Sequence, residues 1–213
     1  MNIGLGFYEI FARIVPGAFY LVFIIQLGLI LNLFSFDFQM LNDLKLIPSL
    51  GLAVITYSLG QMFYPISIYW NRLFKAKDAL DVAYLQFKNR NPNWRIEFAS
   101  KDWRILFAYI RNEKPNLAGE IEKQHAFYLM LGSISFGLLL LSINQVIKYF
   151  LTNSWLNLLY FICLLIASVI LTREGRFFQA RFYQMIFETI LSSELNLDHL
   201  VKYSLEIEDR EKS

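Results

Sequence analysis

The chain has two histidines, His125 and His199, and they limit the acid–base and metal chemistry open to it. His125 follows Glu122 by three residues, the spacing that places two side chains on one face of a helix. Such a pair could share a proton or supply two metal ligands, but a metal site needs further ligands that the sequence does not place nearby. We favour the simpler interpretation, a histidine at the level of the lipid head groups. His199 follows Asp198 and is expected at the surface.

Sequence signatures of enzymes are absent. Nuclease helices of the HEPN type place an arginine four to six residues before a histidine, and neither histidine here has one. Glycine-rich phosphate loops, nucleophile elbows and HExxH motifs are also missing. The single cysteine, Cys163, can form neither an internal disulfide nor a zinc site. We therefore expect a protein that is not an enzyme, with no catalytic residue, no bound metal and no cofactor.

Polar side chains inside the apolar stretches of the chain are more informative, because lipid cannot satisfy their hydrogen bonds. They could line a polar pore, or they could bond to neighbouring helices for about 0.6 kcal/mol each. No charged residue lies in the middle of a stretch, which disfavours a proton-coupled pump or an ion-pair carrier. The candidates for pore or interhelical contacts are Gln26, Asn32, Ser58, Gln61, Ser135 and Asn144.

Basic residues gather directly after two of the apolar stretches. Contact with anionic lipid is their ordinary role, worth about 1 kcal/mol per residue, and a cytoplasmic protein or nucleoprotein partner is the alternative. Direct binding of nucleic acid is disfavoured, because the net charge of the chain is only +2. The candidate partner or lipid contacts are Arg72, Lys75, Arg173, Arg176 and Arg181.

Four apolar stretches must position these side chains. A bilayer core about 30 Å thick needs roughly 20 mostly apolar helical residues to cross it. Hydrophobic residues make up 56% of the chain and charged residues only 18%, against about 25% charged in ordinary globular domains. The sequence thus predicts an all-α integral membrane protein of four helices with helical cytoplasmic extensions. The stretches are Ile14–Phe34, Ile47–Tyr69, Ala126–Tyr149 and Trp155–Thr172.

The distribution of lysine and arginine predicts the orientation. Segment 70–125 between the second and third stretches carries eleven of them, whereas link 35–46 carries one and link 150–154 carries none. Since such residues stay on the cytoplasmic side, we expect a multi-pass inner-membrane protein with both termini in the cytoplasm. The N-terminus lacks a basic leader, so the first stretch is expected to remain as a membrane helix.

Local signals predict where the helices start and stop. Helix one should open at Pro16-Gly17, where proline costs little, after a short interfacial helix. Helix two should kink or leave the membrane at Tyr64-Pro65 and continue through Ser67–Arg90. Further helices are expected over 96–111, from about 117 into the third stretch, and from the fourth stretch to Ser192. The four resulting parts are the interfacial helix with the first hairpin (1–69), a cytoplasmic segment (70–125), the second hairpin (126–172) and a cytoplasmic tail (173–213).

The layout resembles the small multi-pass membrane proteins of bacterial antiviral systems, such as the membrane accessory proteins of type VI-B CRISPR loci. The segments that prompt the resemblance are ARIVPGAFYLVF and REGRFFQARFYQMIFETIL. The resemblance implies a homo-oligomeric effector that perturbs the inner membrane when triggered from the cytoplasm. A non-conducting scaffold that recruits a cytoplasmic partner is one alternative, and a small transporter is another. Convergence of the polar residues on one face would favour a pore, and their dispersal among helix contacts would favour the scaffold.

Overall fold

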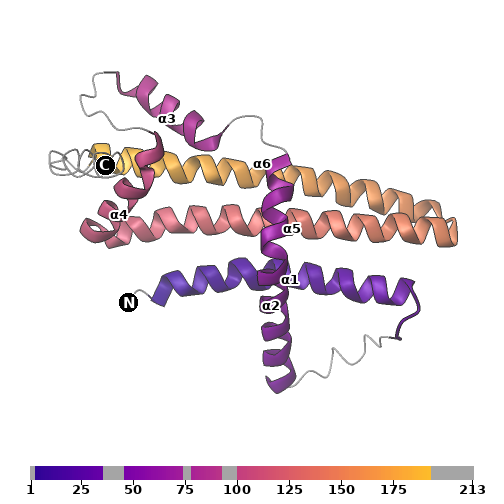
Figure 1. The fold of residues 1–213 in the computed structure, drawn as a ribbon. Helices are drawn as coiled ribbons and strands as arrows, with labels where there is room; N and C mark the ends of the chain where they lie inside the picture. Colours follow the sequence, from indigo (N-terminus) through magenta and orange to yellow (C-terminus); the bar gives the residue numbers. More distant parts are fainter. Residues whose placement is uncertain (1–2, 36–45, 74–77, 93–99, 193–213) are drawn as a thin grey trace, which may run out of the picture. The chain divides into compact units, whose positions relative to one another are not determined.

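A computed structural model describes residues 3–35, 46–73, 78–92 and 100–192, and this part of the chain is helical apart from short turns (Figure 1). It contains no strand, which confirms the all-α prediction for these residues. The elements are α1 (Ile3–Ile30), α2 (Leu46–Leu73), α3 (Ala79–Arg90), a 3₁₀ turn η2 (Ser100–Asp102), α4 (Trp103–Glu113), α5 (Pro115–Thr152) and α6 (Trp155–Ser192).

The chain forms two compact units. The first comprises residues 1–76 and 123–178, and the second comprises residues 77–122 and 179–213. Helices α5 and α6 are each 38 residues long and unbroken, so each contributes to both units. Their continuity agrees with the long helices expected from the sequence.

Three helices in the described part of the chain are long and apolar enough to cross a membrane. They are α1 over residues 10–30, α5 and α6. Helix α2 has 28 residues but is not among them. Three of the four predicted membrane helices are thus confirmed in length and apolar composition within the described residues, and the fourth stays a prediction.

Proline stops neither of the first two helices, and the prediction that helix one opens at Pro16 is wrong. Helix α1 begins at Ile3 and runs through Pro16, so no separate interfacial helix precedes it. Helix α2 runs through Pro65 to Leu73. Proline inside a helix removes one backbone hydrogen bond, and packing against neighbouring helices offsets that loss. Pro16 is fully buried in such a contact.

Helices α1 and α2 touch backbone to backbone. A Cβ atom on Gly17 would meet the carbonyl of Thr56, and one on Gly60 would meet the carbonyl of Arg13. Figure 1 shows α2 crossing α1 at this contact. The two glycines therefore set how closely the helices approach, because any larger residue would separate them.

The second unit has its own hydrophobic core. Helices α3 and α4 contribute Phe87, Leu106 and Ile110, and the end of α6 contributes Phe182 and Phe187. Rings pack edge to face, with the Trp103 centroid 5.7 Å from that of Phe182. Aromatic residues of the central segment and the tail thus make up much of this core. Residues 93–99 of the central segment lie outside the described part.

A helix boundary precedes this core where the sequence predicted one continuous helix. Helix α2 ends at Leu73, and α3 begins at Ala79 after the N-cap residue Asp78. The Asp78 carboxylate accepts a hydrogen bond from the backbone N–H of Leu80 at 3.2 Å. An aspartate in this position satisfies an otherwise unpaired N–H and favours a new helix start.

Candidate functional site

Hydroxyl groups join α5 to α6 inside the first unit. The Ser135 hydroxyl donates to the carbonyl of Ser168 at 2.7 Å, and the Ser168 hydroxyl donates to the carbonyl of Ser135 at 2.7 Å. Thr172 lies one turn further along α6, and its Oγ1 is 2.5 Å from Ser135 Oγ. Small side chains let the two backbones come close enough for this reciprocal bonding.

The same cluster reaches α1 and α2. Ser67 Oγ of α2 lies 3.1 Å from Ser133 Oγ, and the Trp70 indole N–H donates to Ser135 Oγ at 3.1 Å. The Tyr20 hydroxyl of α1 donates to the carbonyl of Ser133 at 2.7 Å. These neutral groups hydrogen-bond one another in a buried site. Four helices thus meet at one polar junction, which we call the hydroxyl junction (Tyr20, Ser67, Trp70, Ser133, Ser135, Ser168 and Thr172).

Asn144 forms a second polar contact between α1 and α5. Its side chain is fully buried, and its Nδ2 donates to the carbonyl of Phe23 at 2.9 Å. Its Oδ1 is buried and has no hydrogen-bond partner in the described part of the chain. An unpaired buried oxygen costs free energy. Asn144 therefore contributes one stabilising hydrogen bond, through Nδ2, and one unfavourable unpaired acceptor, Oδ1.

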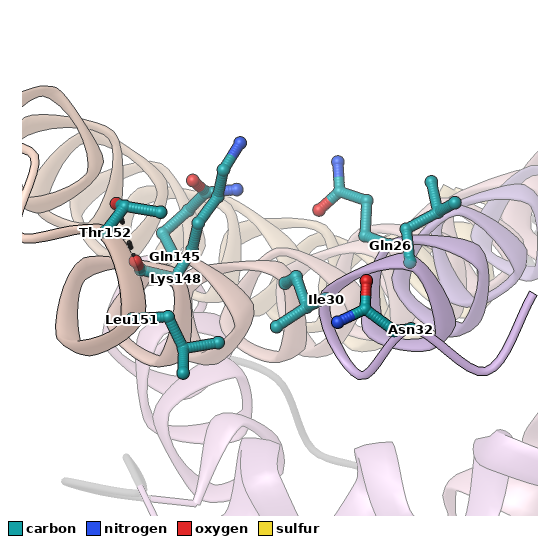
Figure 2. Close-up of a pocket in the computed structure, with 8 residues that line it drawn as sticks. Gln26, Ile30, Asn32, Gln145, Lys148, Leu151 and Thr152 are labelled. Atoms are coloured by element: carbon teal, nitrogen blue, oxygen red, sulfur yellow. Dashed lines mark hydrogen bonds between the residues drawn. The ribbon is translucent and has the colours of Figure 1, made fainter. Parts of the chain in front are cut away.

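A pocket of about 470 Å³ opens where α1 and α5 end (Figure 2). Gln26, Leu29 and Ile30 of α1 line one part of it, and Asn32 follows directly after that helix. Gln145, Lys148, Leu151 and Thr152 of α5 line the rest. Figure 2 shows the Gln26 side chain facing those of Gln145 and Lys148. The Oε1 atom of Gln26 is buried and, among the described residues, has no hydrogen-bond partner.

Two asparagines end the helices beside this pocket. Asn32 has φ 54°, and the N–H of Leu33 bonds back to the carbonyl of Gly28 at 2.9 Å. This is a Schellman ending, which needs a residue that tolerates the left-handed conformation. Asn153 also has a positive φ, 50°, but α5 ends in the simpler αL motif, in which the Asn153 N–H bonds to the carbonyl of Tyr149 at 2.7 Å.

The structure disperses the sequence-predicted polar candidates. Gln26 and Asn32 line the pocket, Ser135 belongs to the hydroxyl junction, and Asn144 bonds α1 to α5. Ser58 and Gln61 are exposed on α2, where the Gln61 amide donates to the Tyr57 hydroxyl at 2.9 Å. The six residues therefore do not converge on one face.

The basic candidates also have separate environments. Arg72 is exposed, with its guanidinium 5.7 Å from the Tyr69 ring centre. Arg173 and Arg181 are exposed. Arg176 is half-buried and donates to the carbonyl of Asn71 at 3.5 Å. Lys75 lies outside the described residues.

Arg13 is not among the candidate residues predicted from the sequence. Its guanidinium lies 3.5 Å from the centre of the Tyr64 ring, across the contact between α1 and α2. Its Nη1 is buried without a hydrogen-bond partner in the described part of the chain. A cation over an aromatic face is stabilised by the ring's quadrupole. Sequence alone gave the charge but not the helix crossing that brings the ring to it.

The residues that the structure describes contain no cluster of metal-ligating side chains. No group of three His, Cys, Asp or Glu side chains there could hold an ion. The His125 ring lies 6.0 Å from that of Tyr128, and His199 lies outside the described residues. Cys163 is exposed as a free thiol on α6.

Comparison of the chain with protein families, with curated proteins and with solved structures gave no match.

Proposed function

We propose that this protein is a membrane-anchored scaffold whose second unit recruits a cytoplasmic protein. The observation that carries the proposal is the use made of the buried polar groups. The hydrogen bonds of Ser135, Ser168 and Asn144 join different helices of one chain. This is expected for residues that pack helices together rather than for residues that line a path through the membrane. The exposed Ser58 and Gln61 stand apart from them on α2.

The proposed anchor spans the bilayer four times. If α1 crosses, its two ends lie on opposite sides, and α2 must begin on the side where α1 ends. The intervening link contains Asp37, Asp43 and Lys45, and so short a segment with three charged residues does not return through lipid. We propose α2 as the returning span, because this keeps the eleven basic residues of segment 70–125 in the cytoplasm.

In the structure α2 crosses α1 instead of running alongside it (Figure 1), and the two helices touch at Gly17 and Gly60. Helix α1 ends thirteen positions after Gly17, at Ile30, and α2 begins fourteen positions before Gly60, at Leu46. The glycines thus have nearly the register that an antiparallel pair of equal length requires.

The proposed docking surface is the basic face of α4. Lys101, just before α4, and Arg104 and Arg111 within it are exposed, at spacings of three and seven residues. Leu106 and Ile110 on the opposite face are buried in the core of the second unit. A basic helical stripe on a packed helix suits an acidic protein surface, since complementary charge steers association.

Charge reversal on this face tests recruitment. We expect the triple variant Lys101→Glu, Arg104→Glu, Arg111→Glu to lose cross-linked partner proteins in intact cells by about tenfold, because like charges repel. The matched control is Lys101→Arg, Arg104→Lys, Arg111→Lys, which keeps every charge. Quantitative mass spectrometry of the cross-linked complexes gives the readout. Identical partner sets for the two variants would contradict the proposed surface.

Membrane potential separates the scaffold from the effector implied by the sequence resemblance. A scaffold leaves the potential of the inner membrane intact on induced expression, alone and together with its captured partner. A potential-sensitive dye measures this directly in growing cells. Collapse of the potential on expression with the partner would overturn the scaffold and favour the membrane-perturbing effector.

A further inference from the structure

The pocket between the ends of α1 and α5 offers an occupant two different polar groups, a hydrogen-bond acceptor and a cation. Gln26 Oε1 is buried there without a partner among the described residues, so it requires a hydrogen-bond donor. Lys148 lines the same pocket and is exposed at its edge, so it favours an anion. The Gln145 amide, which faces Gln26 in Figure 2, can donate to that anion as well.

The position of the pocket places a further demand on the occupant. It lies where two membrane-length helices end, and Leu29, Ile30 and Leu151 line it beside the polar groups. An occupant at this level is bordered by apolar side chains on one side and by water on the other. A volume of about 470 Å³ falls within the range of about 300–1,000 Å³ typical of small-molecule sites.

We propose that this pocket binds the head group of a phospholipid whose amine keeps an N–H, namely phosphatidylethanolamine. The ammonium donates to Gln26 Oε1, while the phosphate accepts from Lys148 and from the Gln145 amide. A charged donor and a charged acceptor both give strong hydrogen bonds. A choline head group has no N–H to offer Gln26. A glycerol head group has only neutral hydroxyl donors, which bond more weakly.

A methylation series of the head group tests the proposal without altering the protein. The full chain is reconstituted in bilayers in which phosphatidylcholine is mixed equally with its ethanolamine, monomethyl or dimethyl analogue, with identical acyl chains. Native mass spectrometry then compares the lipids that leave the bilayer bound to the protein. We expect about tenfold enrichment of the ethanolamine lipid, equivalent to the roughly 1.4 kcal/mol of one added charge-assisted bond. Enrichment persists to the dimethyl analogue, because one N–H remains, and disappears at choline.

Variants test which residues are responsible. In Gln26→Leu the preference for ethanolamine over choline falls to about one, and in Lys148→Gln total lipid retention falls. The control Gln61→Leu makes the same chemical change at an exposed site on α2 and keeps the wild-type preference. Unchanged preference in Gln26→Leu would overturn the assignment.

Two further arms separate the alternatives. Equal retention of phosphatidylglycerol and phosphatidylethanolamine would show an anion site without an amine contact, and it would overturn the proposal. Equal binding of soluble glycerophosphoethanolamine and of the lipid would assign the pocket to a free metabolite and would also overturn it. These readouts use the anchored chain alone, so their failure is distinguishable from failure of the proposed recruitment.

Discussion

At the scale of single residues, Ser135 makes the clearest energetic prediction. Its hydroxyl bonds α6 and accepts from Trp70 of α2. Ser135→Ala should lower the free energy of unfolding by about 1–2 kcal/mol, because polar groups on two helices lose a partner. Ser58→Ala, at an exposed position on α2, should change it by less than about 0.5 kcal/mol. Unfolding in mixed micelles measures both, and equal losses would remove the distinction between the two serines.

The sequence predicted which polar side chains need a hydrogen-bond partner. It did not predict the roles that depend on where helices cross. Ser135 and Asn144 stood out because polar groups in apolar stretches need partners, and both bond to other helices. Tyr20 and Trp70 did not stand out, because an aromatic residue in a membrane helix looks the same whether it faces lipid or a neighbour. Their role depends on where α1 and α2 meet α5.

At the scale of elements, the glycines of α1 and α2 make a second prediction. Gly17→Ala and Gly60→Ala would each force a Cβ onto the backbone of the other helix. Each should destabilise the chain by about 2–3 kcal/mol, the upper range for overpacking. Gly51→Ala, also in α2, meets nothing within 4 Å and should stabilise by about 0.5–1 kcal/mol through helix propensity. Thermal unfolding in detergent compares the three variants. Destabilisation by Gly51→Ala would contradict this account.

Element boundaries followed the sequence where the helical pattern was uninterrupted and departed from it at Pro16 and before α3. Helices α5 and α6 run unbroken over 38 residues each, as their uninterrupted helical pattern indicated. Pro16 looked like a helix start but lies inside α1, because its burial offsets the lost backbone bond. The opposite error occurred before α3, where Asp78 caps a new helix and the apolar pattern had hidden the break.

At the scale of the whole molecule, the sides of the membrane on which Asn153 and Lys114 lie discriminate between three and four spans. If α2 crosses, the turn at Asn153 between α5 and α6 lies outside the cell and Lys114 lies in the cytoplasm. If α2 does not cross, both positions change sides, since every later span is inverted. The charge distribution favours the first arrangement, because segment 70–125 holds eleven of the basic residues.

Cysteine labelling decides between the two arrangements. In a Cys163→Ser background, Asn153→Cys should react with a membrane-impermeant maleimide in intact cells, and Lys114→Cys should react only after permeabilisation. Both positions lie at helix ends, so neither substitution disturbs a core, and Asn153→Cys carries a local cost of about 1–2 kcal/mol because Asn153 has φ 50°. The reverse pattern would establish three spans and would place the basic face of α4 outside the cell. The proposed recruitment of a cytoplasmic partner would then also be wrong, because the inversion that moves Lys114 to the other side of the membrane moves Arg104 and Arg111 there too.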